Sequence, residues 1–144
     1  MSAEAFYRQC LQQIERKMGN KGTGESEIEQ MSDFFLRNPT RWKGVFALNE
    51  PWRKTGGYRV VNLEPRGNRG EHWVGVANNL IYDSFGRNRV VEIREHKLGI
   101  RPFGEYSYTA PDAEQLKQED NCGQRCIAWL MVYDKYGETA ARSI

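Results

Sequence analysis

The stretch HWVGVANNLIYD, residues 72–83, decides how we interpret the rest of the chain. Its first six residues are typical of a β-strand, and its last four are typical of a returning strand. Asn78 and Asn79 between them suit a two-residue turn, because asparagine tolerates the positive φ that such turns require. The pattern therefore predicts a β-hairpin in which Ala77 pairs with Leu80.

Counting back along this hairpin places Val74 opposite Asp83, so that His72 lies one diagonal step from Asp83. Side chains on such a diagonal are within reach of each other. A carboxylate beside an imidazole fixes the ring tautomer and favours the imidazolium ion. The hairpin thus predicts a general base, His72, oriented by Asp83. A structural histidine and a plain turn aspartate are the alternatives.

Two helices are predicted on the N-terminal side of this hairpin. Residues 3–18 carry an apolar stripe at helical spacing, and Gly19 ends it. A second helix is expected over 26–36, with Ser26 as N-cap and Glu29 completing a capping box. The side chains expected to face inward are Phe6, Tyr7, Cys10, Leu11, Ile14, Met18, Ile28, Met31, Phe34 and Phe35.

The C-terminal part predicts one buried helix. Residues 122–136 are apolar on nearly all sides, Gly137 ends the pattern, and 138–144 are expected to fray. Apolar runs at 45–48 and 58–63 indicate further strands, whereas residues 95–110 show no clear period. The order of helices, strands and a core helix is typical of the α+β class, in one domain over 1–144.

Composition excludes some classes of protein. The chain has 144 residues, 39% of them hydrophobic, and no apolar run near the roughly 20 residues that span a membrane. The start MSAEAFYRQC lacks the pattern of a secretory signal, so we expect a soluble, intracellular protein without membrane partners. The net charge of +2 favours no partner. One basic run could bind phosphates or form a solvated surface: Arg53, Lys54, Arg59, Arg66 and Arg69.

The three cysteines favour a nucleophile over a disulfide or a metal site. Their number is odd, and no second cysteine pair accompanies Cys122 and Cys126, so we expect no metal and no other cofactor. Cys122 lies where a loop becomes a helix, and the helix dipole there lowers the pKa of a thiol. Gly123 leaves room for a substrate backbone beside the sulfur. A cysteine at this position is otherwise a small buried side chain.

A cysteine nucleophile also requires donors for the developing oxyanion. The backbone N–H of Cys122 is one donor. A side-chain amide just upstream is the natural second donor, and both Gln115 and Gln118 stand at suitable positions. Gln124 lies inside the helix and is expected to face elsewhere. The residues alone leave the choice between Gln115 and Gln118 open.

The order of His-Trp, an acidic residue before Phe-Gly, and Cys-Gly resembles the adenovirus-type maturation proteases (adenain). It also resembles their virophage and polinton relatives and, more distantly, the SUMO-deconjugating proteases. The resemblance spans about residues 34–136. It includes RWKGVF (41–46), YRVVNLEPRGNRGEHWVGVA (58–77), YDSFG (82–86) and NCGQRCIAWL (121–130).

The resemblance implies a papain-like or adenain-like fold, in which the helix of the nucleophile packs on a small, mostly antiparallel sheet. It makes His72 the base, Asp83 its partner and Cys122 the nucleophile. It favours Gln115 over Gln118 as the oxyanion donor. Trp73 would shape the substrate groove, so that only small residues pass near the scissile bond.

The function implied is that of a monomeric cysteine endopeptidase that cuts viral structural or precursor proteins after glycine. Capsid or core precursors would be its substrates, DNA or a peptide its activators, and the virion or assembly site its location. Two alternatives share the same residues: a deconjugase for ubiquitin-like proteins, and an inactive capsid or nucleic-acid-binding module on the same fold. A folded modifier needs a large exosite, for which 144 residues leave little room.

Overall fold

The computed structural model describes residues 1–38, 40–47, 50, 56–63, 72–90, 93, 106–116 and 119–144. Helices precede and follow a group of strands, which confirms the α+β class. The elements are α1 (Ala3–Met18), α2 (Glu25–Phe35), β1 (Trp42–Ala47), β2 (Tyr58–Asn62), β3 (Trp73–Ala77), β4 (Leu80–Tyr82), β5 (Ser107–Tyr108), α4 (Cys122–Tyr136) and α5 (Glu138–Arg142).

The strands form one five-stranded sheet in the order β1-β2-β3-β4-β5. The pairs β2–β3 and β3–β4 are antiparallel, whereas β1–β2 and β4–β5 are parallel. The sheet is therefore mixed, and the expectation of a mostly antiparallel sheet is wrong. Strand direction at the two edges depends on where long connections lead, and a local apolar pattern carries no information about that.

The central hairpin has the predicted register. Ala77 pairs with Leu80 and Gly75 with Tyr82. Asn78 takes a φ of 53°, the left-handed conformation that the two-residue turn requires. This pairing, continued by one residue, sets Asp83 beside the start of β3.

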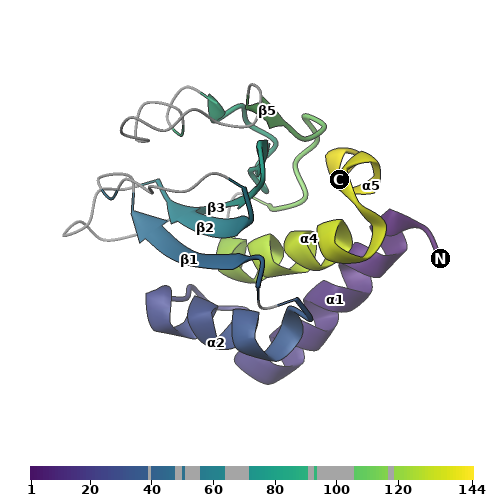
Figure 1. Ribbon diagram of the computed structural model, residues 1–144. Helices are drawn as coiled ribbons and strands as arrows, with labels where there is room; N and C mark the ends of the chain where they lie inside the picture. Colours follow the sequence, from purple (N-terminus) through teal and green to yellow (C-terminus); the bar gives the residue numbers. More distant parts are fainter. Residues whose placement is uncertain are drawn as a thin grey trace.

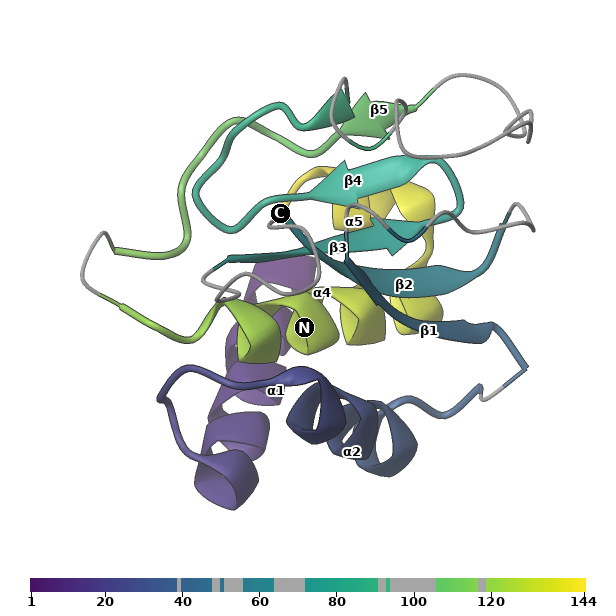
Figure 2. The same ribbon diagram turned by 90° about the vertical axis from the view of Figure 1, so that its left-hand side faces the viewer.

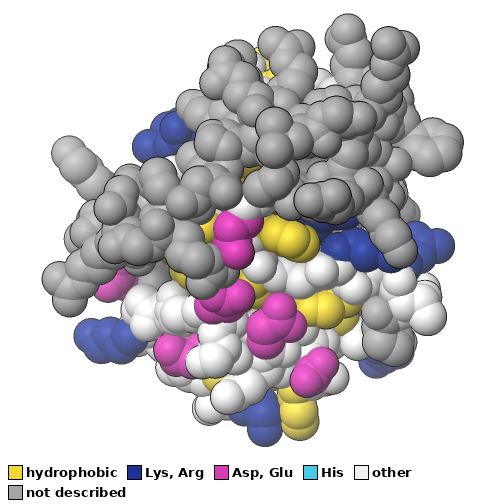
Figure 3. Space-filling view, turned by 60° about the vertical axis from the view of Figure 1, so that its left-hand side comes forward, with side chains coloured by type: hydrophobic (Ala, Val, Ile, Leu, Met, Phe, Trp, Pro, Cys, Tyr) yellow, Lys and Arg dark blue, Asp and Glu magenta, His cyan; other side chains and the backbone are white. Residues whose placement is uncertain are grey.

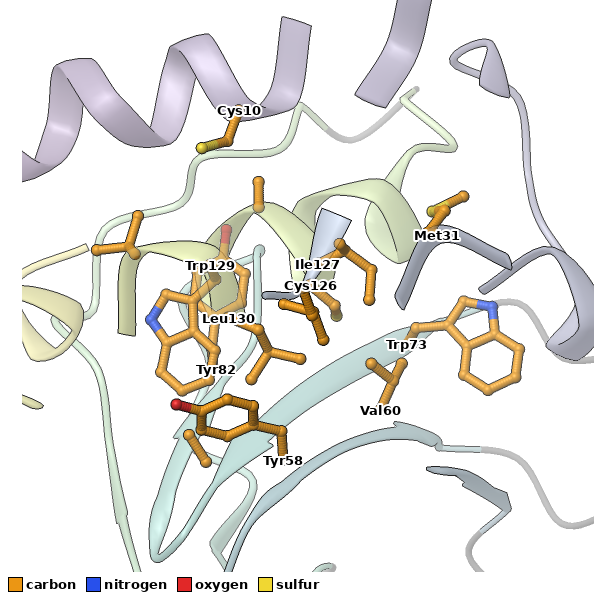
Figure 4. Packing of buried hydrophobic residues seen from close by; sticks show 14 of the residues in the cluster. Cys10, Met31, Tyr58, Val60, Trp73, Tyr82, Cys126, Ile127, Trp129 and Leu130 are labelled. Atoms are coloured by element: carbon orange, nitrogen blue, oxygen red, sulfur yellow. The ribbon is translucent and has the colours of Figure 1, made fainter. Parts of the chain in front are cut away.

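Helix α4 lies between the sheet and the pair α1 and α2, as Figures 1 and 2 show. A helix in this position is covered on both sides, which explains why its side chains are apolar nearly all round. Trp129 stacks on Tyr82 with 5.2 Å between ring centroids and 7° between planes. Figure 4 shows Leu130 near this pair, between α4 and Tyr58 of the sheet. This core positions the N-terminus of α4 against the hairpin.

The start of α2 differs from the prediction. The helix begins at Glu25, and its N-cap is Gly24, whose N–H donates to the Glu27 carboxylate at 3.1 Å. Ser26 lies inside the first turn, so its predicted role as N-cap is wrong. The glutamate that reaches back to the N-cap is Glu27, which stands three residues after Gly24. Phe34, predicted to face inward, is 61% exposed.

The C-terminal residues form a docked helix, α5, instead of a frayed tail. Ala141 and Ile144 are buried. The indole N–H of Trp129 donates to the Ala141 carbonyl at 2.9 Å, which ties α5 to α4. Helix α5 has only 5 residues, too few for a stable isolated helix, and the contact with Trp129 supplies the stability that its length does not.

The surface shows where charges gather. On the face in Figure 3, described acidic side chains lie together near the centre and basic ones toward the edges. Arg59, from the predicted basic run, lies buried in β2, and its Nη1 donates to the Gly56 carbonyl at 2.6 Å. The other four basic residues of that run lie outside the described residues. None of the helices described is long and apolar enough to cross a membrane.

Candidate active site

The end of the hairpin brings His72 and Asp83 together. His72 Nε2 lies 2.8 Å from Asp83 Oδ1. Asp83 is buried, and its carboxylate also accepts the backbone N–H of Phe85 at 2.8 Å. The guanidinium groups of Arg87 and Arg89 donate to Oδ2 at 3.1 and 3.0 Å. The carboxylate is therefore held in one orientation from four directions.

These donors keep Asp83 ionised. Burial alone would raise the pKa of this carboxyl group, but the hydrogen bond and charge of His72 outweigh it, helped by the Phe85 N–H and Arg89. The pKa falls from 3.8 to about 2. An ionised carboxylate only accepts hydrogen bonds, so Nε2 of His72 carries the proton and Nδ1 has the free lone pair in the neutral ring.

Asp83→Asn should lower the free energy of unfolding at pH 7 by roughly 2 kcal/mol, since one pKa unit corresponds to about 1.4 kcal/mol. The folded-state pKa lies below the ordinary value of 3.8, so wild type has this stabilisation above about pH 4 and loses it as the pH falls through 2. Urea unfolding of both proteins between pH 7 and pH 2.5 measures the difference. A difference that stays constant over this range would contradict the assignment.

Cys122 is the first residue of α4, and its side chain faces the start of β3. Its Sγ accepts the backbone N–H of Trp73 at 3.4 Å, which places the sulfur beside the residue that follows His72. Nδ1 of His72 is buried and has no hydrogen-bond partner among the residues that the structure describes. The fold thus brings together the three residues that the sequence selected: His72 from just before β3, Asp83 from just after β4, and Cys122 from the start of α4.

The pKa of Cys122 lies above its ordinary value, and the predicted lowering is wrong. Burial of the thiol has the largest effect, and the N–H groups of Trp73 and Gly123 compensate for only part of it. Only 5% of the surface of Cys122 is exposed. The helix dipole therefore acts on a thiol that has lost most of its contact with water, and this loss disfavours the charged thiolate. A thiol in this state needs a nearby base to become nucleophilic at neutral pH.

Gln115 is a buried residue of the loop that leads to α4, and it contacts Ser84, the residue after the acidic partner. Its Oε1 accepts the Ser84 hydroxyl at 2.5 Å, and its Nε2 donates to the Glu119 carbonyl at 2.6 Å. Nε2 carries two hydrogens, so one remains after this bond. Gln118 lies outside the described residues.

Trp73 and Gly123 both contact the linker between α1 and α2. The Trp73 indole N–H donates to the Thr23 carbonyl at 3.0 Å. A Cβ built on Gly123 would clash with the Thr23 hydroxyl and lie 3.3 Å from Ile28. The space beside Gly123 is therefore filled by the chain itself, and close helix–linker packing replaces room for a substrate as the reason for a glycine here.

No protein-family model matches this chain, and no curated protein matches it in sequence. Among the described residues, no group of three or more His, Cys, Asp or Glu side chains could hold a metal ion.

Sequence reasoning missed the arginines of the site. Arg87 and Arg89 follow the Asp83 turn closely, and two arginines within six residues of a candidate catalytic carboxylate were a usable signal. Arg125 lies one turn into α4 and is buried, although it is charged. A charged residue within an otherwise apolar helix is costly unless it is paired, so its presence indicated a buried partner.

Proposed function

We propose that this protein is a cysteine peptidase in which Cys122 is the nucleophile, His72 the base and Asp83 the residue that orients the base. The observation that carries the proposal is the state of the imidazole. Asp83 holds Nε2, while the buried Nδ1 has no partner among the described residues and lies near the strand residue that contacts the Cys122 sulfur. A papain-like or adenain-like arrangement is part of this proposal.

The mechanism follows from these positions. Nδ1 of His72 takes the Cys122 proton, and the thiolate attacks the carbonyl carbon of a peptide bond. The oxyanion that forms is held by the Cys122 N–H and the second Nε2 hydrogen of Gln115. The imidazolium then protonates the leaving amine, which departs and leaves a thioester. Water, deprotonated by His72, hydrolyses the thioester and restores the thiol.

The substrate class is a peptide with a small residue before the scissile bond, and glycine suits best. Trp73 and Cys122 are both nearly buried, so a large side chain has little space beside the sulfur. A cavity of about 240 Å³ borders Asn121, the residue before Cys122. It is lined by Asn20, Lys21, Glu119, Asp120 and Asn121.

Iodoacetamide labelling of Cys122 across pH tests the proposal. Near pH 7 the wild type should react at least tenfold faster than His72→Ala, because burial keeps the thiol protonated unless Nδ1 takes its proton. Peptide mapping separates Cys122 from Cys10 and Cys126, which are buried internal controls.

The contrary result is equally clear. If wild type and His72→Ala label Cys122 at the same rate, and neither cleaves glycine-containing peptides, the peptidase proposal fails. Cleavage of a folded ubiquitin-like conjugate in preference to short peptides would instead identify a deconjugase.

A further inference from the structure

Arg125 links the nucleophile helix to the loop before it. The residue is buried, one turn after Cys122, at the inner surface of α4. Its Nε donates to the side-chain oxygen of Asn121, the residue before Cys122, at 3.1 Å. Its Nη2 reaches the Glu119 carboxylate at 3.4 Å. Two of its nitrogens thus hold the chain immediately upstream of the nucleophile.

The third nitrogen of Arg125 reaches toward the strand of the acidic partner. Nη1 donates to the Tyr7 hydroxyl at 3.1 Å, and this hydroxyl shares a 2.6 Å hydrogen bond with the Tyr82 hydroxyl. Tyr82 directly precedes Asp83. Through Tyr7, helix α1 therefore takes part in joining α4 to β4, although it is far from the site in sequence.

Gln115 completes a ring of contacts. Its Nε2 donates to the carbonyl of Glu119, whose carboxylate also accepts the backbone N–H of Leu116 at 2.7 Å. Its Oε1 accepts the hydroxyl of Ser84, the residue after Asp83. The ring thus begins on one side of Asp83, passes through Arg125 and Glu119, and returns to its other side through Gln115.

We propose that Arg125 is a positioning residue for the oxyanion hole, holding the loop with Gln115 against the N-terminus of α4. This inference rests on the proposed function, since it concerns the same site. A guanidinium suits the role because its donors lie in one rigid plane and can bind Asn121, Glu119 and Tyr7 at once. Lysine has one flexible ammonium group and cannot keep all three contacts.

The experiment separates oxyanion stabilisation from thiol activation. Alkylation by iodoacetamide requires the thiolate but displaces iodide at a saturated carbon, so it forms no oxyanion. Peptide cleavage requires both. Arg125→Met should therefore lower kcat for a glycine-containing fluorogenic peptide at least about 100-fold, the usual cost of losing one oxyanion donor. KM and the Cys122 alkylation rate should change less than about threefold.

Two further variants keep the test sharp if Arg125→Met folds poorly. Tyr7→Phe removes a single hydroxyl from the ring and should lower kcat by about three- to tenfold, the usual effect of one hydrogen bond. Arg142→Met is the matched control: this arginine is about half exposed and pairs only within its own helix turn with Glu138 among the described contacts. It should leave every readout at the wild-type value.

Hydrogen exchange supplies a readout that does not need activity. In Arg125→Met, amides in peptides containing Gln115 and Glu119 should exchange at least about tenfold faster, while those of β3 stay unchanged. Unchanged exchange there overturns the inference whether or not the chain is a peptidase. Equal losses of kcat and alkylation also overturn it. A wild type that cleaves no peptide and labels independently of His72 overturns the proposed function instead.

Discussion

Cys122→Ala will lower kcat/KM for a glycine-containing peptide by about 10⁴-fold or more, to the background that substrate binding alone supports. Loss of a catalytic nucleophile typically has an effect of this size. Cys126→Ala is the matched control. This second cysteine lies one turn further along α4, is fully buried, and has a pKa raised well above its ordinary value by burial. The kcat/KM of Cys126→Ala should therefore lie within about threefold of the wild-type value.

Steady-state kinetics with one peptide, for both variants and wild type, decides between the two thiols. Equal activity losses in the two variants would mean that disturbance of α4, and not loss of a nucleophile, explains the result. Activity that survives in Cys122→Ala would rule out the proposed mechanism.

Trp129→Ala will lower the free energy of unfolding by about 3–5 kcal/mol, as expected for removal of a buried tryptophan. The indole is fully buried, stacks on Tyr82, and donates to the Ala141 carbonyl. Gly75 fits closely against it: a Cβ there would lie 3.1 Å from the ring. Few side chains nearby are free to fill the cavity, so relaxation recovers little.

Phe34→Ala is the control for this measurement, because Phe34 is mostly exposed. This substitution should change the free energy of unfolding by no more than about 0.5 kcal/mol. Urea unfolding followed by circular dichroism gives both values. A loss below about 1.5 kcal/mol for Trp129→Ala would contradict the central place of this residue in the core. In Trp129→Ala, the amides of α5 should also exchange their hydrogens faster, because the indole of Trp129 holds this helix.

The core and the site depend on each other through α4. The same helix presents Trp129 to Tyr82 and Cys122 to the start of β3, so the depth at which its apolar side packs determines where the sulfur lies. Packing of side chains in a close-fitting core permits few alternative depths. Removal of the Trp129 side chain should therefore reduce activity as well as stability, whereas surface changes on α2 should not.

Local sequence was sufficient for three elements. Helix α1 has a clear apolar stripe ended by Gly19, α4 has its predicted bounds of 122–136, and the hairpin has the register given by Asn78. In each of them, the signal is a short-range pattern: a period, a turn residue or a helix stop. The diagonal placing of His72 beside Asp83 followed from that register alone, and the 2.8 Å contact agrees with it.

Long-range features were not accessible in this way. The parallel edge pairings, the docking of α5 and the packing of Thr23 against Gly123 each join segments whose own sequences carry no sign of the partner. The pKa of Cys122 belongs here too. Its position at a helix start was visible in the sequence, but the degree of burial that outweighs the dipole was not.

The sequence by itself determined the hairpin, the central helix and the candidate triad, because turn chemistry and apolar period act over a few neighbouring residues. Only the tertiary structure decided how Cys122 meets the strand of His72, and how Arg125 joins Tyr7, Glu119 and Asn121. Those contacts join α4 to α1, to β3 and to the loop that precedes α4. Their geometry depends on how deeply whole elements pack against one another, a property that no local stretch of residues specifies.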